Sequence, residues 1–296
     1  MNIASPPHAD CDPPARAPSR AAQRLPAGTC DAHLHVFGPH ARYPLDARRN
    51  YTPHACGLDD YRQVMQAIGV DRAVLVQPSV YGTDNSAMLD ALHAGGAAFR
   101  GVAVPAPDTD DDALKHMHAL GVRGIRLNLV NPQVVGAGEV LTLLERLKKL
   151  GLPWHMQLLA DLAHDPDALL SLCDKTDAPI VVDHMGKLPP SVRAHPLFDL
   201  LKSGRCWVKL SAPYRVSAQP PPHGDITNLA RALADANPAR AVWGTDWPHT
   251  ELHNGTPAAA SLADLLHAWL PDPATLRHIC VTNPARLYEF PQEKTA

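Results

Sequence analysis

The chain has 296 residues, of which 45% are hydrophobic and 19% charged, and its formal net charge is −3. Such a chain is long enough for one large domain with a sizeable core. Its near-neutral charge provides no basic surface for nucleic acid, and its longest apolar runs are too short to span a membrane. We therefore expect neither nucleic acid nor a membrane as a partner. The six scattered cysteines form no CxxC pair, which favours reduced thiols and a cytoplasmic location.

Residues 1–26 differ in composition from the rest of the chain. They are rich in proline, alanine, arginine and serine and offer little apolar surface to bury, so we expect a disordered tail here. The segment has no apolar stretch of the length that a secretory signal requires. The folded part is expected to span residues 27–296 as a single domain.

After Thr29, short β-branched runs alternate with longer segments of helical periodicity. The short runs predict eight strands, at residues 30–35, 73–78, 100–104, 124–129, 154–158, 180–183, 207–210 and 241–245. The longer segments predict helices, at residues 58–68, 85–94, 110–120, 138–150, 165–175, 196–201, 226–237, 258–269 and 273–281. Eight strands with helical crossovers predict an α/β fold, a (β/α)8 barrel of the TIM type. A doubly wound open sheet is the alternative, but no GxGxxG motif or P-loop follows the first strand.

The residues at the carboxyl ends of these strands form the candidate site, because the catalytic groups of such barrels lie at that end. His33 and His35 are two apart in the first strand and therefore share a face. A single histidine at a strand end is usually structural, but two imidazoles on one face of a dry barrel would be costly without partners. Asp246 ends the last strand after an apolar run, and His184 follows an apolar strand in the same way.

Polar residues that could bind a substrate follow other strands. Arg126 and Asn128 share a face of the fourth strand, and Arg215 follows the seventh. An arginine at a strand end suits a carboxylate because of its planar fork, although both arginines could instead form structural ion pairs. We expect His249 to contact the substrate or support a neighbour, and His155 to lie too deep in the fifth strand to reach the site.

Four segments carry a resemblance to a known family: residues 30–39 (CDAHLHVFGP), 122–126 (VRGIR), 182–187 (VDHMGK) and 243–249 (WGTDWPH). Together they are similar to the amidohydrolase superfamily, and within it to the 2-pyrone-4,6-dicarboxylate lactonase branch. The resemblance implies the same barrel and a lactone hydrolase. It implies that Asp246 is the general base for water, and that the catalytic histidines polarise the ester carbonyl as hydrogen-bond donors. These histidines are His33, His35 and His184, and the residues implied to hold substrate carboxylates are Arg126, Arg215, Tyr51 and Ser79.

The resemblance also bears on metals. Most amidohydrolases bind one or two divalent ions, whereas the lactonase branch works without metal. Mononuclear relatives have a histidine ligand at the end of the fifth strand, where this chain has Gln157, and an amide is a poor zinc ligand. No lysine stands on the fourth strand to be carbamylated. We therefore expect no cofactor and a substrate contact for Gln157. The alternative is one divalent metal, such as zinc, at His33, His35 and Asp246.

The substrate is expected to be a small carboxylated lactone. The loop after the fourth strand reads Val130-Asn131-Pro132-Gln133 and lacks an arginine that pyrone lactonases are expected to have there. A sugar-acid lactone or a muconolactone type is therefore expected, in aromatic-compound catabolism, acted on by a monomer or small homo-oligomer. The alternatives are a sugar-acid lactone isomerase, a metal-dependent amidohydrolase or decarboxylase, and a non-catalytic binding protein, which the intact histidine and aspartate set disfavours.

Overall fold

A computed structural model describes residues 10–14, 18–131, 135–253 and 255–291 of the chain. Eight parallel strands pair in chain order, each with the next. They are β1 (Cys30–Leu34), β2 (Arg72–Val76), β3 (Phe99–Ala103), β4 (Val122–Asn128), β5 (His155–Leu159), β6 (Ile180–Val182), β7 (Cys206–Ser211) and β8 (Ala241–Gly244). All eight predicted strands are present, with ends shifted by at most two residues. The prediction of a (β/α)8 barrel is confirmed.

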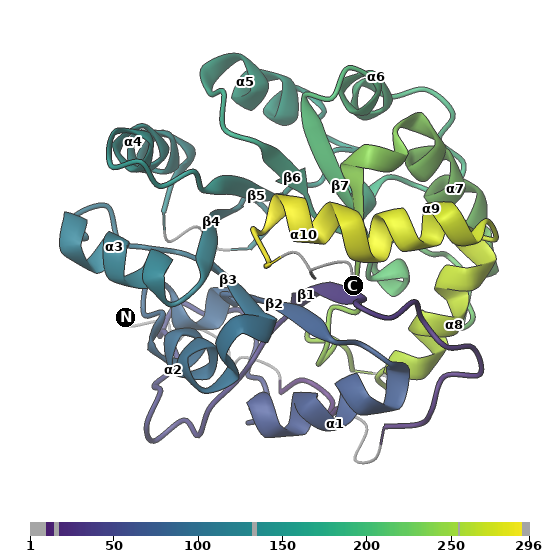
Figure 1. Cartoon of the computed structure of the whole chain (residues 1–296), viewed down its shortest axis with the longest axis horizontal. Helices are drawn as coiled ribbons and strands as arrows, with labels where there is room; N and C mark the ends of the chain where they lie inside the picture. The colour runs from purple at the N-terminus through teal and green to yellow at the C-terminus, as the bar shows by residue number, and fades with distance from the viewer. Residues whose placement is uncertain (1–9, 15–17, 132–134, 254, 292–296) are drawn as a thin grey trace, which may run out of the picture.

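Helices α1 to α8 surround the strands, and α9 and α10 cross one end of the barrel (Figure 1). The helices are α1 (Leu58–Ile68), α2 (Ser86–Gly95), α3 (Asp111–Ala119), α4 (Ala137–Lys149), α5 (Asp167–Lys175), α6 (Pro196–Lys202), α7 (Thr227–Ala236), α8 (Ala259–Trp269), α9 (Pro273–Arg277) and α10 (Asn283–Leu287). The last predicted helix continues beyond α9 as a π-helical turn, η7 (His278–Thr282). None of the described helices is long and apolar enough to cross a membrane.

The barrel closes where the ends of β1 and β8 meet. Asp246 N donates to His33 O and His35 N donates to Trp247 O, both at 2.8 Å. The two strands approach so closely that a Cβ at position 244 would lie 2.7 Å from the His33 Cβ, which explains the glycine there. Closure of the barrel therefore places the two predicted catalytic segments side by side.

The opposite end of the barrel is sealed by the chain after α10. Tyr288 and Phe290 join a cluster of apolar side chains that fills the inside of the barrel, while a larger cluster lies between strands and helices. Arg100 fixes this segment by donating from Nε to Tyr288 O at 3.1 Å and from Nη2 to Glu289 O at 2.8 Å. Access to the barrel interior is thus left to the end where the strands terminate.

The described part of residues 1–26 is packed against the barrel. Cys11 N donates to Thr52 O at 2.9 Å, Asp12 N donates to Leu252 O at 2.8 Å, and the side chains of Cys11 and Leu25 are buried. The expectation of a disordered tail is therefore wrong for residues 10–14 and 18–26, whereas residues 1–9 and 15–17 lie outside the described residues. The composition of the segment did not indicate this packing, because much of the segment is attached through backbone hydrogen bonds, which most residue types can make.

Candidate active site

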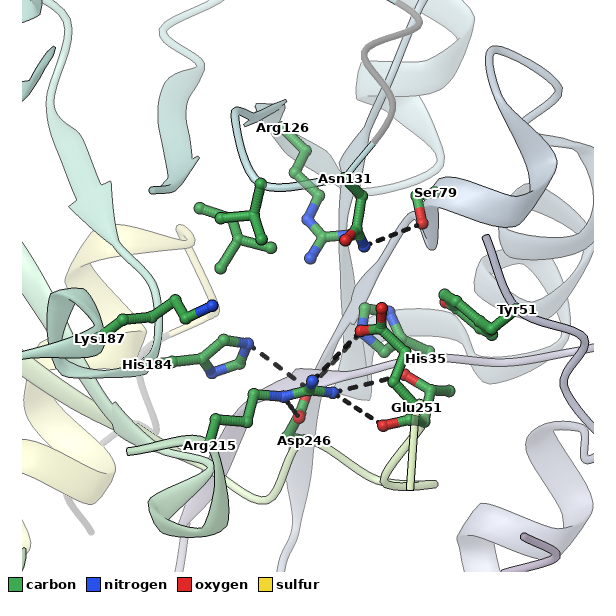
Figure 2. A pocket seen from close by; sticks show the side chains of 13 residues that line it. His35, Tyr51, Ser79, Arg126, Asn131, His184, Lys187, Arg215, Asp246 and Glu251 are labelled. Carbon is green, nitrogen blue, oxygen red and sulfur yellow. Dashed lines mark hydrogen bonds and ion pairs between the residues drawn. The ribbon is translucent and has the colours of Figure 1, made fainter. Parts of the chain in front are cut away.

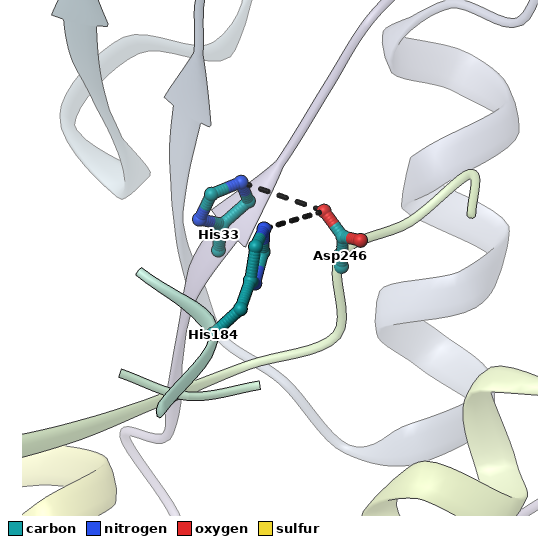
Figure 3. Close-up of side chains that lie close together, drawn as sticks. All are labelled: His33, His184 and Asp246. Carbon is teal, nitrogen blue, oxygen red and sulfur yellow. Dashed lines mark ion pairs between the residues drawn. The ribbon is translucent and has the colours of Figure 1, made fainter. Parts of the chain in front are cut away.

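Asp246 lies at the centre of the site, and three imidazoles surround one of its oxygens. The Nε2 atoms of His33, His35 and His184 lie 3.5, 3.6 and 3.7 Å from Asp246 Oδ1 (Figures 2 and 3). All four side chains are buried. The structure therefore brings together the four predicted catalytic residues from β1 and from the segments after β6 and β8.

The backbone around two of these residues is left-handed. Asp246 has a φ of +61°, and four consecutive residues, His184, Met185, Gly186 and Lys187, have φ values from +50° to +65°. Non-glycine residues seldom adopt this conformation, and strain of this kind is concentrated at functional sites. The turn directs His184 at Asp246 and brings Lys187 to the edge of the same space (Figure 2).

The second oxygen of Asp246 is held by two donors. Tyr214 donates from its hydroxyl at 2.6 Å, and Arg215 donates from Nε at 2.9 Å. Burial alone would raise the pKa of Asp246, but the Arg215 guanidinium and the nearby histidines hold it well below its ordinary value. The carboxylate is therefore ionised at neutral pH, and its Oδ1 accepts no hydrogen bond from the described residues. An oxygen in this state can take a proton from a water molecule.

A cavity of about 200 Å³ lies beside Asp246, smaller than the roughly 300–1,000 Å³ typical of ligand pockets. Four predicted substrate-binding residues, Tyr51, Ser79, Arg126 and Arg215, line it (Figure 2). The charged side chains on its wall are three cations and two carboxylates, namely Arg126, Lys187, Arg215, Asp246 and Glu251. This excess of positive charge favours a small anionic ligand.

The two predicted arginines are engaged differently. Arg215 pairs with Asp246 and with Glu251, whose Oε2 lies 3.2 Å from its Nη1. The structural ion pair that was one expectation for this arginine is therefore present. Arg126 instead donates from Nη1 to the Gln77 carbonyl at 2.9 Å. Its Nε lies 4.0 Å from Asp183 Oδ2 and donates no hydrogen bond to the described residues, so Arg126 is the better placed of the two to hold a substrate anion.

A buried polar layer lies under the histidines. Lys209 of β7 donates to Gln157 Oε1 at 2.6 Å, and its Nζ lies 3.4 Å from Asp183 Oδ1 and 3.3 Å from His33 Nδ1. Gln157 Nε2 in turn donates to Asp183 Oδ2 at 3.0 Å. Gln157 therefore does not line the cavity, contrary to the expected substrate contact, because its amide oxygen and amide nitrogen both form hydrogen bonds within this layer. Burial lowers the pKa of Lys209 to about 8.

Two other predicted residues lie at the margin of the site. The Asn128 side chain accepts hydrogen bonds from Val130 N and Asn131 N, both at 3.0 Å, and so shapes the loop after β4. His249 is not among the residues that line the cavity; its Nδ1 lies 3.3 Å from the Tyr214 hydroxyl. His249 is thus placed to support the tyrosine that holds Asp246.

His155 lies in the lower part of the barrel, as predicted, with its ring centroid 5.3 Å from that of Tyr288. Pro132 and Gln133, which stand where a further arginine was expected, lie outside the described residues. Lys209, Tyr214, Lys187 and Glu251 were not predicted. Of these, Lys209 had a readable signal, since a charged residue inside a strand that is otherwise apolar must be buried with partners.

Some of these side chains could in principle surround a cation. His33, His184 and Asp246 each offer a ligand atom, and these atoms lie within 4.8 Å of one another (Figure 3). Among the described residues, His184 thus takes the place of His35 in the alternative metal set that was expected. The Nδ1 atoms of His35 and His184 make hydrogen bonds of their own. His35 Nδ1 lies 2.8 Å from Val76 O, and His184 Nδ1 lies 2.9 Å from Ser211 Oγ.

A strand-end site with histidines and an aspartate, in a barrel of eight parallel strands, is typical of hydrolases of the amidohydrolase type. The chain belongs to the amidohydrolase family, whose model matches residues 30–290. The resemblance inferred from the four sequence segments is therefore confirmed, as is the prediction of an enzyme of this superfamily.

Three curated proteins are similar over nearly their whole length. The 4-sulfomuconolactone hydrolase of Hydrogenophaga intermedia is 35% identical, with 89% of each chain covered. The 2-pyrone-4,6-dicarboxylate hydrolase of Comamonas testosteroni is 34% identical, covering 93% of this chain and 94% of the relative. The D-galactarolactone isomerase of Agrobacterium fabrum is 30% identical, covering 90% and 92%. A crystal structure of an Agrobacterium tumefaciens protein superposes with a TM-score of 0.82 at 28% identity, covering 92% of this chain and all of that one.

Proposed function

We propose that the protein hydrolyses a small anionic lactone without a bound metal, using Asp246 as the general base. The observation that carries this proposal is the state of the Asp246 carboxylate. Tyr214 and Arg215 hold one oxygen, while the other faces the imidazole Nε2 atoms at 3.5 to 3.7 Å and accepts no hydrogen bond from the described residues. The names of the three curated relatives, two lactone hydrolases and one lactone isomerase, support the substrate class.

In the proposed reaction, a water molecule beside Asp246 Oδ1 attacks the lactone carbonyl carbon and gives a proton to the carboxylate. The carbonyl oxygen becomes an oxyanion, which imidazole N–H groups stabilise. The bond between the carbonyl carbon and the ring oxygen then breaks, and the proton passes from Asp246 to that oxygen. The product is a hydroxy acid, or its keto form where the leaving oxygen belongs to an enol.

The donor set around Asp246 fits a metal poorly. Arg215 occupies one carboxylate oxygen, and the Lys209 ammonium lies 3.3 Å from His33 Nδ1. Gln157, at the strand position where mononuclear relatives are expected to have a ligand, is committed to Lys209 and Asp183. A catalytic zinc takes three protein ligands, usually histidine or carboxylate. His33, His184 and Asp246 reach that number, but the two fixed cations beside them, Arg215 and Lys209, support a metal-free reaction.

The charge of the cavity supports an anionic substrate. Arg126 and Lys187 both line it, and the described residues place no carboxylate within ion-pair distance of Lys187. A carboxylate or sulfonate on the lactone would supply the missing partner, since a fixed guanidinium binds such groups through paired hydrogen bonds. We propose that Arg126 and Lys187 bind this group, with Tyr51 and Ser79 as neutral contacts.

A panel of lactones tests the proposal. Carboxylated and sulfonated five- and six-membered lactones are offered alongside their uncharged esters, and ring opening is followed by loss of ultraviolet absorbance and by proton release. We expect turnover of at least one anionic lactone, and no turnover by Asp246→Asn. Faster hydrolysis of uncharged lactones than of every anionic one would contradict the anion assignment.

Lactone isomerisation is the second candidate, because one relative is named an isomerase and a carboxylate such as Asp246 can shuttle a proton between ring and hydroxyl oxygens. Labelled water separates the two reactions. Hydrolysis in H₂¹⁸O places one heavy oxygen in the product carboxylate, whereas transfer of the acyl group between hydroxyls of one molecule places none. Mass spectrometry of the product decides between them.

A further inference from the structure

Lys209 is a buried cation to which the proposed reaction assigns no role. It is fully buried in β7, and its ammonium meets three acceptors: Gln157 Oε1 at 2.6 Å, His33 Nδ1 at 3.3 Å and Asp183 Oδ1 at 3.4 Å. An ammonium has three N–H donors and no lone pair. Two of these contacts have hydrogen-bond geometry, those to Gln157 Oε1 and to a ring nitrogen of His33, whereas Asp183 is an ion-pair partner.

This contact determines which nitrogen of His33 carries the proton. A neutral imidazole has one protonated and one unprotonated nitrogen, and only the unprotonated one can accept from Lys209. Asp183 Oδ1 lies 3.3 Å from the same Nδ1 and would favour the opposite tautomer. That oxygen, however, accepts no hydrogen bond from the described residues, whereas the Lys209 contact has hydrogen-bond geometry. The proton of His33 is therefore on Nε2, which faces Asp246.

His35 has the opposite arrangement. Its Nδ1 lies 2.8 Å from the Val76 carbonyl, which can only accept, so Nδ1 carries the proton. Its Nε2 is then an acceptor, and it lies 3.6 Å from Asp246 Oδ1, which is also an acceptor. Two acceptors at this separation can share the two protons of one water molecule, leaving a lone pair of that water free to attack.

We propose that Lys209 is a positioning residue that gives His33 and His35 different hydrogen-bonding roles. Lys209 makes His33 a hydrogen-bond donor toward the substrate carbonyl, and the Val76 carbonyl makes His35 an acceptor that orients the water with Asp246. The assignment to carbonyl and water depends on the proposed lactone hydrolysis, whereas the two tautomers do not. Donation by Lys209 also removes the lone pair that a metal would need on His33 Nε2.

Nitrogen-15 NMR of the free protein with labelled histidine tests this directly, because protonated and unprotonated ring nitrogens resonate far apart. The His33 and His35 signals are assigned from their loss in His33→Gln and His35→Gln. We expect the Nε2–H tautomer for His33 and the Nδ1–H tautomer for His35 in the wild type. An Nδ1–H tautomer of His33 in the wild type would overturn the proposal, and this result needs neither a substrate nor a folded Lys209 variant.

Lys209→Met provides the second measurement. Without the ammonium, His33 is expected to carry its proton on Nδ1, which lies 3.3 Å from Asp183 Oδ1, so the His33 tautomer reverses while that of His35 is unchanged. Lys187→Met removes a lysine at the cavity wall that does not touch His33, and it should alter neither tautomer. If a substrate has been found, kcat of Lys209→Met should fall about 10²- to 10³-fold, as for loss of one oxyanion donor, with a smaller change in KM. An unchanged His33 tautomer in Lys209→Met would overturn the proposed role of Lys209.

Discussion

Arg215 and Asp246 form a charge-assisted pair in which Arg215 Nε donates to Asp246 Oδ2 at 2.9 Å. The guanidinium keeps the Asp246 carboxylate ionised and fixes the direction of its free oxygen. Arg215→Met should therefore lower kcat by about 10- to 150-fold, the loss expected for a hydrogen bond to a charged group, more than it raises KM. Steady-state kinetics on the best lactone measure kcat and KM separately. A rise in KM at unchanged kcat would instead make Arg215 a substrate clamp, as the sequence suggested.

Asp246→Asn should fold normally and lose about 10²- to 10⁴-fold in kcat, because an amide cannot take a proton from water. The pKa of Asp246 is held well below its ordinary value, so the wild-type rate should not depend on ionisation of this group near neutral pH. Asp161→Asn, at a carboxylate paired with His164 outside the cavity, is the matched control. Near-normal turnover by Asp246→Asn would exclude it as the base.

Arg126→Met is expected to act on binding. Loss of one charge-assisted contact should raise KM for an anionic lactone by about 10- to 150-fold and leave kcat nearly unchanged. The uncharged methyl ester of the same lactone is the internal control, since its KM should hardly respond to the substitution. Equal effects on the acid and its ester would show that Arg126 is structural.

Removal of metal should have no effect on the rate. We expect activity to survive prolonged chelation, and elemental analysis to find well under one divalent ion per chain, because Arg215 occupies one oxygen of Asp246 and the Lys209 ammonium lies 3.3 Å from His33 Nδ1. The result that counts against this prediction is stoichiometric zinc or manganese whose removal abolishes turnover and whose return restores it.

His155 should make the protein sensitive to acid. Burial lowers its pKa to about 3, and neither ring nitrogen has a hydrogen-bond partner among the described residues. Between an unfolded-state pKa near 6.5 and about 3, the unfolded chain binds a proton that the folded protein does not. This residue therefore lowers the free energy of unfolding by up to about 1.4 kcal/mol for each unit of falling pH in that window.

Urea unfolding of His155→Leu, from neutral pH down to about 5, measures this effect. The variant should lose less stability on acidification than the wild type does, because it lacks the proton that the unfolded histidine takes up. His93→Leu, at an exposed position of α2, should show the wild-type pH dependence. Parallel pH curves for wild type and His155→Leu would contradict the assignment.

The strands and helices could be predicted because each leaves a local pattern. The helix at 58–68 was predicted to the residue: it buries one face, and Gly69, with φ of +75°, ends it. His33 and His35 were predictable for a similar reason, since the two-residue period of a strand places them on one face whatever the rest of the fold does.

Loop geometry and depth in the barrel were less accessible from the sequence. Tyr214 reaches Asp246 because Ala212 is left-handed, with φ of +48°, and nothing in the residue types indicates that turn. Gln157 was predicted on the correct face of its strand but at the wrong depth in the barrel. The alternation of side chains along a strand indicates which face a residue occupies, but not how far it lies from the open end of the barrel.

The contacts of residues 10–14 have a practical consequence for handling the protein. Glu251 N donates to Cys11 Sγ at 3.2 Å, and Gly255 N donates to Asp12 Oδ2 at 2.6 Å, so this short segment braces the loop that carries the second carboxylate partner of Arg215. Trimming the chain to the start of β1, or fusing a bulky tag close to Asp10, would therefore loosen one wall of the cavity. Shortening the protein for crystallisation or immobilisation would therefore alter the candidate active site from more than two hundred residues away in the chain.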